Sequence, residues 1–324
     1  LASEASRFTL DSGTEPWLLS VNFLEPHMPF FGPYNDLHSE TEAPVPPNYP
    51  GDTMELEPES YRKKRKEYYE KGFEGEDLKS RPGWQRLNRN YAGLCTQVDQ
   101  ALGRILWALE ASGQMENTLI VFTSDHGEMM GAHGLIGKGV MYEEAMHVPL
   151  LIRAPFLQQA PQRIQRNTSS IDIVPTVLDL MNRKPTAPLP GHSLRALMSG
   201  GSHPEPFVFS QWNNGAANPM RSAARSRDRQ PAGAAGSLST AAGQRAEAAG
   251  EGGGPNARTV ISPEGLKLVL HDKDHSMLLD RRASGLGLHW WPALLAGFFI
   301  GVVVLCAVVV AVAVRGLSPT LLRC

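Results

Sequence analysis

Apolar residues in this chain of 324 residues form short strand-like runs and one long helical stripe. Residues 17–23 and 118–123 are short apolar runs bounded by polar residues, which is the pattern of buried strands. Between them, residues 84–112 carry apolar side chains at steps of three and four, which predicts an amphipathic helix. A strand, a helix and a second strand in this order indicate a right-handed crossover in an α/β sheet.

The same patterns divide the chain into parts. Residues 1–200 form the predicted α/β domain, which includes a further strand at 148–153, and residues 201–220 are a connection. Residues 221–257 are rich in Ala, Gly, Ser and Arg and hold almost no bulky apolar side chain, so we predict a disordered insert. Residues 258–282 then begin with the pattern of a β-hairpin around a Ser-Pro-Glu-Gly turn.

A continuous apolar segment without charge covers residues 293–314. At about 1.5 Å of rise per residue, a helix of this length crosses a hydrocarbon core of roughly 30 Å. Two tryptophans precede the segment and Arg315 follows it, as at a membrane interface. We therefore predict one transmembrane helix over residues 290–315 and a single-pass membrane protein, with basic residues on both sides leaving its topology open.

Charge and cysteine content exclude some classes. The net charge of −2 and the lack of a dominant basic face argue against nucleic-acid binding. Three cysteines are too few for a disulfide framework and show no metal-ligand spacing. The basic run at residues 62–66 is largely neutralised by nearby glutamates, so we predict a solvated helix face there.

Candidate chemistry follows the predicted strands. Asp125 and His126 come directly after the strand at 118–123, where open α/β sheets place their ligands, and a carboxylate with an imidazole suits a divalent metal. A glycine-spaced segment with His133 and Lys138 follows. His27 lies between prolines after the strand at 17–23. Taken singly, these residues are as well explained by helix capping, core packing or surface placement.

Together, the motifs closely resemble those of the sulfatase family, which has an alkaline-phosphatase-like fold. The resemblance covers residues 17 to about 280, and the Asp-His-Gly form is most similar to the branch with choline-sulfatase-like enzymes, iduronate sulfatase and phosphonate monoester hydrolases. The matching residues are Asp125-His126-Gly127, His133-Gly134, Lys138, Tyr142-Glu143 and Val148-Pro149-Leu150. The resemblance implies an α/β sandwich around a mixed central sheet, with a small C-terminal α+β subdomain whose remnant is the hairpin.

The resemblance also implies roles. Asp125 and His126 would bind a divalent metal, most often Ca²⁺, with Mg²⁺ or Mn²⁺ as alternatives. Lys138 and His27 would neutralise the sulfate group and assist the leaving group, and His133 is a weaker candidate for substrate binding. The implied reaction is hydrolysis of a sulfate ester on a sulfated small molecule or glycan, in a lumenal, extracellular or periplasmic domain.

The family's nucleophile is a formylglycine made from the Cys or Ser of a C/S-x-P-x-R motif, and this sequence contains no such motif. An N-terminal Asp-Asp pair of metal ligands is also absent. We therefore expect the later part of a sulfatase domain, as a fragment or as a truncated product that does not turn over alone. A phosphonate monoester or phosphodiester hydrolase, and a non-catalytic membrane-tethered relative that binds sulfated glycans, stay open as alternatives.

Overall fold

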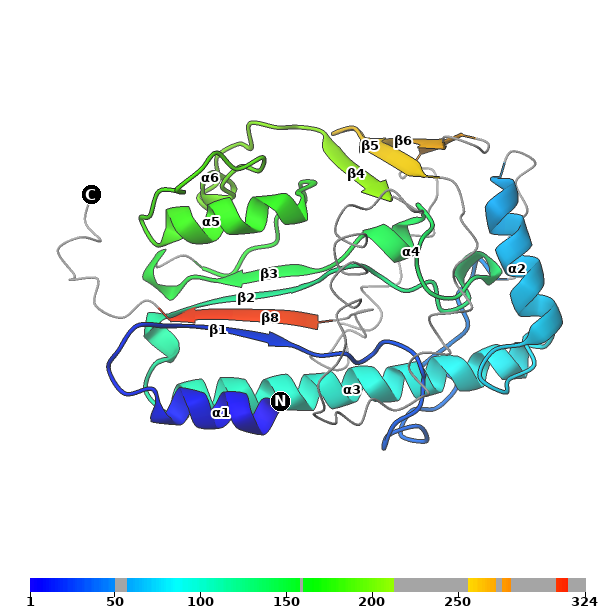
Figure 1. Ribbon diagram of the computed structural model, residues 1–324, viewed down its shortest axis with the longest axis horizontal. Coiled ribbons are helices and arrows are strands. Elements are labelled where there is room, and N and C mark those ends of the chain that lie inside the picture. Colours follow the sequence, from blue (N-terminus) through cyan, green and yellow to red (C-terminus); the bar gives the residue numbers. More distant parts are fainter. Residues whose placement is uncertain (50–56, 158–159, 213–255, 272–275, 281–306, 314–324) are drawn as a thin grey trace, which may run out of the picture.

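The computed structural model describes residues 1–49, 57–157, 160–212, 256–271, 276–280 and 307–313 (Figure 1). Helices and a small second sheet surround a central sheet. The helices are α1 (Ala2–Asp11), α2 (Glu59–Lys71), α3 (Arg81–Ala111), α4 (Glu143–Met146), α5 (Ile173–Leu180) and α6 (Arg195–Met198). The strands are β1 (Trp17–Asn22), β2 (Thr118–Ser124), β3 (Leu150–Arg153), β4 (Val208–Trp212), β5 (Ala257–Ile261), β6 (Leu266–His271), β7 (Met277–Asp280) and β8 (Ala307–Ala313).

The predicted strands and the long helix are confirmed within a few residues. Helix α3 begins with a proline in its first turn. Ser112 and Gly113 end it, and Gly113 adopts a left-handed backbone with a φ of +69°. Its apolar stripe packs on one face of the central sheet, where Val98 and Ile105 meet Val21 of β1. Helix α5 covers the other face, where Leu180 packs with Leu119 of β2. The result is a layered α/β arrangement (Figure 1).

The central sheet has the strand order β1-β8-β2-β3 among the described residues. Each pairing in it is antiparallel. Strands β1 and β2 run in the same direction, but β8 lies between them, so the predicted mixed pairing is wrong for the described strands. The register places Asn22 and Thr123 opposite the same residue, Val308, which means that β1 and β2 end side by side.

The predicted transmembrane helix is not supported. Residues 307–313 of that segment form strand β8, whereas residues 290–306 and 314–315 lie outside the described residues. Within the described ranges, no helix has both the length and the apolar character needed to cross a membrane. The pattern fits both structures: a valine-rich run in which polar and apolar residues do not alternate is also typical of a strand that lies between two other strands. The β-branched side chains of such a run favour strands.

The second sheet has the order β4-β5-β6-β7, again antiparallel throughout its described part. The predicted hairpin is confirmed as β5 and β6, and the predicted connection at 201–220 supplies β4. The described part of this C-terminal unit contains strands and no helix, so the expected α+β character is not seen there. The predicted disordered insert, 221–257, lies outside the described residues except for Asn256 and Ala257.

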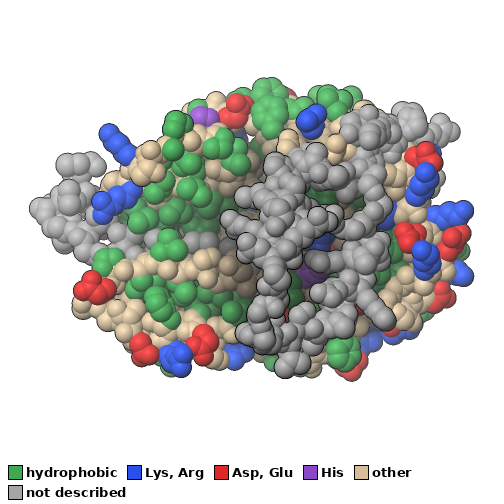
Figure 2. Space-filling model, viewed as in Figure 1, with side chains coloured by type: hydrophobic (Ala, Val, Ile, Leu, Met, Phe, Trp, Pro, Cys, Tyr) green, Lys and Arg blue, Asp and Glu red, His purple; other side chains and the backbone are tan. Residues whose placement is uncertain are grey.

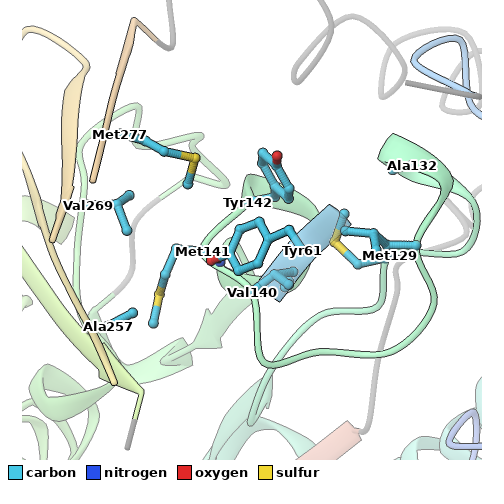
Figure 3. Packing of buried hydrophobic residues seen from close by; sticks show 11 residues of the cluster. Tyr61, Met129, Ala132, Val140, Met141, Tyr142, Ala257, Val269 and Met277 are labelled. Atoms are coloured by element: carbon cyan, nitrogen blue, oxygen red, sulfur yellow. The ribbon is translucent and has the colours of Figure 1, made fainter. Parts of the chain in front are cut away.

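A buried cluster joins the second sheet to the rest of the protein (Figure 3). Val269 and Met277 from this sheet share the cluster with Tyr61 of α2 and with Val140 and Met141, which follow β2 in the chain. The second sheet and α2, which are far apart in the sequence, therefore both pack against the residues after β2.

The surface is divided by character. Figure 2 shows charged side chains of both signs at the end of the molecule where α2 lies, and hydrophobic side chains over the central sheet. Leu18 of β1 is 65% exposed and Leu151 of β3 is 58% exposed. On α2, the exposed pairs Lys63–Glu59 and Lys66–Glu70 confirm a solvated face for part of the basic run.

Candidate active site

His27 and Lys138 are 111 residues apart in the sequence and come into direct contact. The Nζ atom of Lys138 lies 2.5 Å from Nε2 of His27. The Nδ1 atom of His27 lies 2.8 Å from the carbonyl oxygen of Met28. Because a carbonyl only accepts hydrogen bonds, Nδ1 carries the proton and Nε2 accepts from the Lys138 ammonium. The pair thus combines a cation with an oriented imidazole.

Asp125 and His126 form a second pair directly after β2. The Asp125 carboxylate lies 3.6 Å from Nε2 of His126 and is 56% exposed. The Nδ1 atom of His126 donates to the carbonyl oxygen of Gly127 at 2.8 Å, which leaves the Nε2 lone pair available. Oδ1 of Asp125 accepts the backbone N–H of His126 at 2.9 Å, which fixes the carboxylate. An oriented carboxylate and an imidazole nitrogen at this separation fit two positions around a divalent metal.

The pair is not a complete metal site by itself. Within the described part of the chain, no group of three or more His, Cys, Asp or Glu side chains is arranged to hold a metal ion. Ca²⁺ takes about six to eight oxygen ligands, so Asp125 and His126 fit only part of such a coordination shell. The remaining ligands would have to come from other groups or from water.

Gly127 permits a close approach that fixes the turn after β2. A Cβ atom at this position would lie 1.9 Å from the carbonyl oxygen of Glu144. The N–H of Gly127 donates to the carbonyl oxygen of Ala145 at 2.9 Å. This contact starts the segment that we call the glycine loop, residues 127–142. Gly137 and Gly139, on either side of Lys138, have φ values of +79° and +84°, a conformation that favours glycine. The spacing of glycines around Lys138 therefore has a direct conformational cause.

Glu128, the second residue of the glycine loop, has a buried side chain. Its role was not identified from the sequence. Its Oε1 atom accepts the N–H of Met130 at 3.3 Å and also that of Gly137. Burial raises the pKa of Glu128, while these hydrogen bonds and the cations of Lys138 and Lys64 oppose that shift. Glu128 therefore anchors the backbone next to Lys138 from the interior side.

His133 points to different partners from those of Lys138. Its ring stacks on Tyr142 with centroids 4.0 Å apart, and its Nε2 lies 3.2 Å from Nδ2 of Asn48. Burial lowers the pKa of His133, and the neighbouring carboxylate of Glu144 partly opposes this. These contacts hold the loop to its surroundings, and the role of His133 in substrate binding stays a prediction.

Helix α2 supplies further residues that the sequence did not reveal. Lys64 donates to the carbonyl oxygen of Lys138 at 2.7 Å, and Arg65 donates to that of His133 at 2.5 Å. Arg65 also pairs with the carboxylate of Glu57, which is 2% exposed. The basic run is thus divided between solvent and interior, and the prediction of a wholly solvated face is wrong for these two residues. The spacing of Tyr61, Lys64, Arg65 and Tyr68 is a helical stripe that could have indicated it.

Comparisons with known proteins identify relatives of this chain. The chain is 31% identical over 196 residues to the multifunctional alkaline phosphatase superfamily protein PehA of Trinickia caryophylli, which covers 58% of this chain and 38% of that protein. It is 32% identical over 149 residues to an N-acetylglucosamine-6-O-sulfatase of Bacteroides thetaiotaomicron, with coverages of 46% and 26%. The chain spans less than half the length of these relatives.

A solved structure shows the same fold. The phosphonate monoester hydrolase SpPMH from Silicibacter pomeroyi superimposes with a TM-score of 0.59 at 28% identity, covering 80% of this chain and 49% of that one. This similarity confirms the predicted alkaline-phosphatase-like α/β fold. The family model described as Sulfatase matches residues 1–183, which is more than half of the 324 residues. The chain therefore belongs to the sulfatase family.

Proposed function

We propose that this protein is a sulfuric ester hydrolase and that His27 and Lys138 receive the sulfate group. The contact between Lys138 and His27 carries the proposal, because it combines a cation with an oriented imidazole. Family membership supports the reaction type, and the name of the N-acetylglucosamine-6-O-sulfatase relative supports a sulfated glycan as one substrate class. A sulfated small molecule is the other class.

The two side chains suit complementary tasks. The Lys138 ammonium would neutralise the negative charge of the sulfate ester, including the charge that develops on the leaving oxygen as the ester bond breaks. Nε2 of neutral His27 accepts a hydrogen bond from that ammonium, and after taking up a proton from solvent at this atom His27 would deliver it to the leaving oxygen. The Nδ1 bond to Met28 keeps the ring oriented for that transfer.

Asp125 and His126 would hold a divalent metal, with Ca²⁺ as the first candidate and Mg²⁺ or Mn²⁺ as alternatives. Sulfatases generally use a divalent metal together with a formylglycine nucleophile. A bound metal would polarise sulfate oxygens as a Lewis acid. The sequence contains no C/S-x-P-x-R motif, so the proposal assigns no nucleophile within these residues.

Hydrolysis of phosphonate monoesters or phosphodiesters is the second candidate. The structural similarity to a phosphonate monoester hydrolase favours it, because the same cation and imidazole suit both anions. A location in a lumenal, extracellular or periplasmic space stays a prediction.

The test is anion binding to this chain, measured by calorimetry with inorganic sulfate and with methylphosphonate. We expect His27→Ala and Lys138→Ala each to weaken sulfate binding by about tenfold or more, as for loss of a hydrogen bond to a charged group. The matched control is Lys184→Ala, because Lys184 is exposed. Equal sulfate affinity in wild type and Lys138→Ala would refute the site, and tighter binding of methylphosphonate would favour the second candidate.

In any longer form that carries a C/S-x-P-x-R motif, hydrolysis of 4-nitrophenyl sulfate should depend on Lys138 and on the metal pair. We expect Lys138→Ala to lower turnover by about a hundredfold or more, the size typical for loss of one group that stabilises developing charge. Unchanged turnover in this variant would contradict the proposed function.

A further inference from the structure

One face of α2 is directed at the backbone of the glycine loop. Its residues recur at positions i, i+3, i+4 and i+7, so they line one side of the helix. Each makes a hydrogen bond to a main-chain atom of the loop and none of these bonds involves a loop side chain. The bonds join Tyr61 Oη to the N–H of Met141 (2.8 Å), Lys64 Nζ to the carbonyl of Lys138 (2.7 Å), Arg65 Nε to the carbonyl of His133 (2.5 Å) and Tyr68 Oη to the carbonyl of Ile136 (3.1 Å).

The packing around these bonds is tight. Figure 3 shows Tyr61 lying among Val140, Met141 and Tyr142, and the rings of Tyr61 and Tyr142 have centroids 5.4 Å apart. The side chains on this face of α2 are therefore held in a buried contact with the loop. A shift of α2 would be transmitted to the loop backbone.

Lys64 and Glu128 hold the backbone of Lys138 from both ends. The N–H of Gly137, which precedes Lys138, donates to the buried carboxylate of Glu128. The carbonyl of Lys138 itself accepts from Lys64. These bonds constrain the peptide group between Ile136 and Gly137 and the one between Lys138 and Gly139, so the backbone is held on both sides of residues 137–138, from which the Lys138 side chain extends. The glycines at positions 137 and 139 could not fix this backbone alone, because glycine is conformationally permissive.

The burial of Lys64 carries a cost that its neighbours avoid. Lys63 and Lys66 reach solvent, with side chains 73% and 74% exposed, whereas burial lowers the pKa of Lys64 and the carboxylate of Glu128 opposes that shift. Lys64 is half-buried, and an ammonium withdrawn from water in this way needs its charge and hydrogen bonds to be compensated. A lysine retained at this cost points to a role for its hydrogen bond to the carbonyl of Lys138.

We propose that Lys64 is a positioning residue, which acts through the carbonyl of Lys138 to hold the Lys138 ammonium against His27. The proposal rests on the proposed function of the His27–Lys138 pair in binding an anion. It assigns to α2 a part in the site although none of its side chains is proposed to touch the substrate.

The test compares two variants at position 64 with a matched neighbour in the full chain. Lys64→Met removes the ammonium and keeps a similar length, and Lys64→Arg keeps a charged donor. Lys63→Met removes an exposed ammonium one residue away. The two measurements are the dissociation constant for inorganic sulfate, by calorimetry, and the rate at which Lys138 is acylated, by mass spectrometry.

We expect Lys64→Met to weaken sulfate binding about tenfold and to speed the acylation of Lys138 several-fold, because the ammonium is no longer held against His27. Lys64→Arg should restore both values to within about threefold, since a cationic donor remains. Lys63→Met should match the wild type in both. Unchanged values in Lys64→Met, or the same changes in Lys63→Met, would overturn the positioning role.

Lys138→Ala separates this proposal from the proposed function. Sulfate binding that survives Lys138→Ala refutes the anion site, whereas acylation of Lys138 still tests Lys64 because it requires no bound anion. If Lys64→Met does not fold, Lys64→Gln is measured instead, since it is polar but shorter than lysine and places no charged donor at the carbonyl of Lys138. Acylation faster than in Lys63→Met supports the proposal, and an equal rate overturns it.

Discussion

The buried pair of Glu57 and Arg65 offers a sharp test of what holds α2 in place. Glu57 is 2% exposed, and its carboxylate accepts from Arg65 at 2.8 Å through Nη1 and from the Tyr142 hydroxyl at 2.8 Å. Glu57→Gln keeps the shape of the side chain but removes its charge. The guanidinium of Arg65, whose side chain is only 15% exposed, then loses its counter-charge.

The expected cost follows from the burial of both partners. Removing one member of a buried ion pair costs about 3–5 kcal/mol, and the lower end applies because Arg65 keeps its bond to His133. We therefore expect Glu57→Gln to lower the free energy of unfolding by about 3 kcal/mol, measured by urea denaturation. Glu70→Gln is the matched control: its pair with Lys66 is exposed on both sides and should cost at most about 0.5 kcal/mol.

A second substitution checks the cause. Combining Glu57→Gln with Arg65→Met replaces the remaining buried cation by an apolar side chain, so the double variant should recover part of the lost stability. If Glu57→Gln costs no more than Glu70→Gln, or if the double variant loses the sum of the two single effects, the assignment of stability to this buried pair is wrong.

Three further predictions concern the loop and the metal pair. Gly127→Ala should lower the free energy of unfolding by about 2 kcal/mol or more, because its Cβ would meet the backbone of Glu144, whereas Gly103→Ala on the open surface of α3 should raise it by up to about 1 kcal/mol; equal effects in urea denaturation would contradict this. Burial lowers the pKa of His133, so the unfolded chain takes up a proton below its ordinary value of 6.5 while the folded chain does not, and stability should fall as pH decreases below 6.5. His133→Gln should flatten that part of the curve, and an unchanged slope would refute the reasoning. Asp125→Asn should weaken binding of Ca²⁺ alone, measured by calorimetry, by about tenfold or more, and equal affinity would exclude the carboxylate as a ligand.

Local patterns predicted the scaffold well where one periodicity dominated. The stripe of α3 and the apolar run of β2 each favoured a single element, and both are confirmed. The motif around Asp125 and Lys138 also indicated the region of the site, because glycine spacing and strand ends are local features of the sequence. Roles for these residues are supported by their geometry and stay proposals.

Long-range features were not accessible in the same way. The run at 307–313 is apolar throughout, and such a run fits a membrane helix or a buried strand equally, so only its pairing partners distinguish them. The helical spacing of Lys64 and Arg65 shows that they share a face of α2, but it does not contain the loop carbonyls to which they donate. Glu128 was likewise invisible as an anchor, because its partners are backbone N–H groups.

The position of β8 has a consequence for synthesis of the protein. Among the described strands, β1 and β2 are joined through β8, which follows β2 far along the chain. Until residue 313 has emerged, both inner strand edges lack a partner, although the helices that cover the sheet are already made. Completion of the sheet therefore waits for synthesis of β8, and the emerging chain should depend on protection from aggregation until that strand is made.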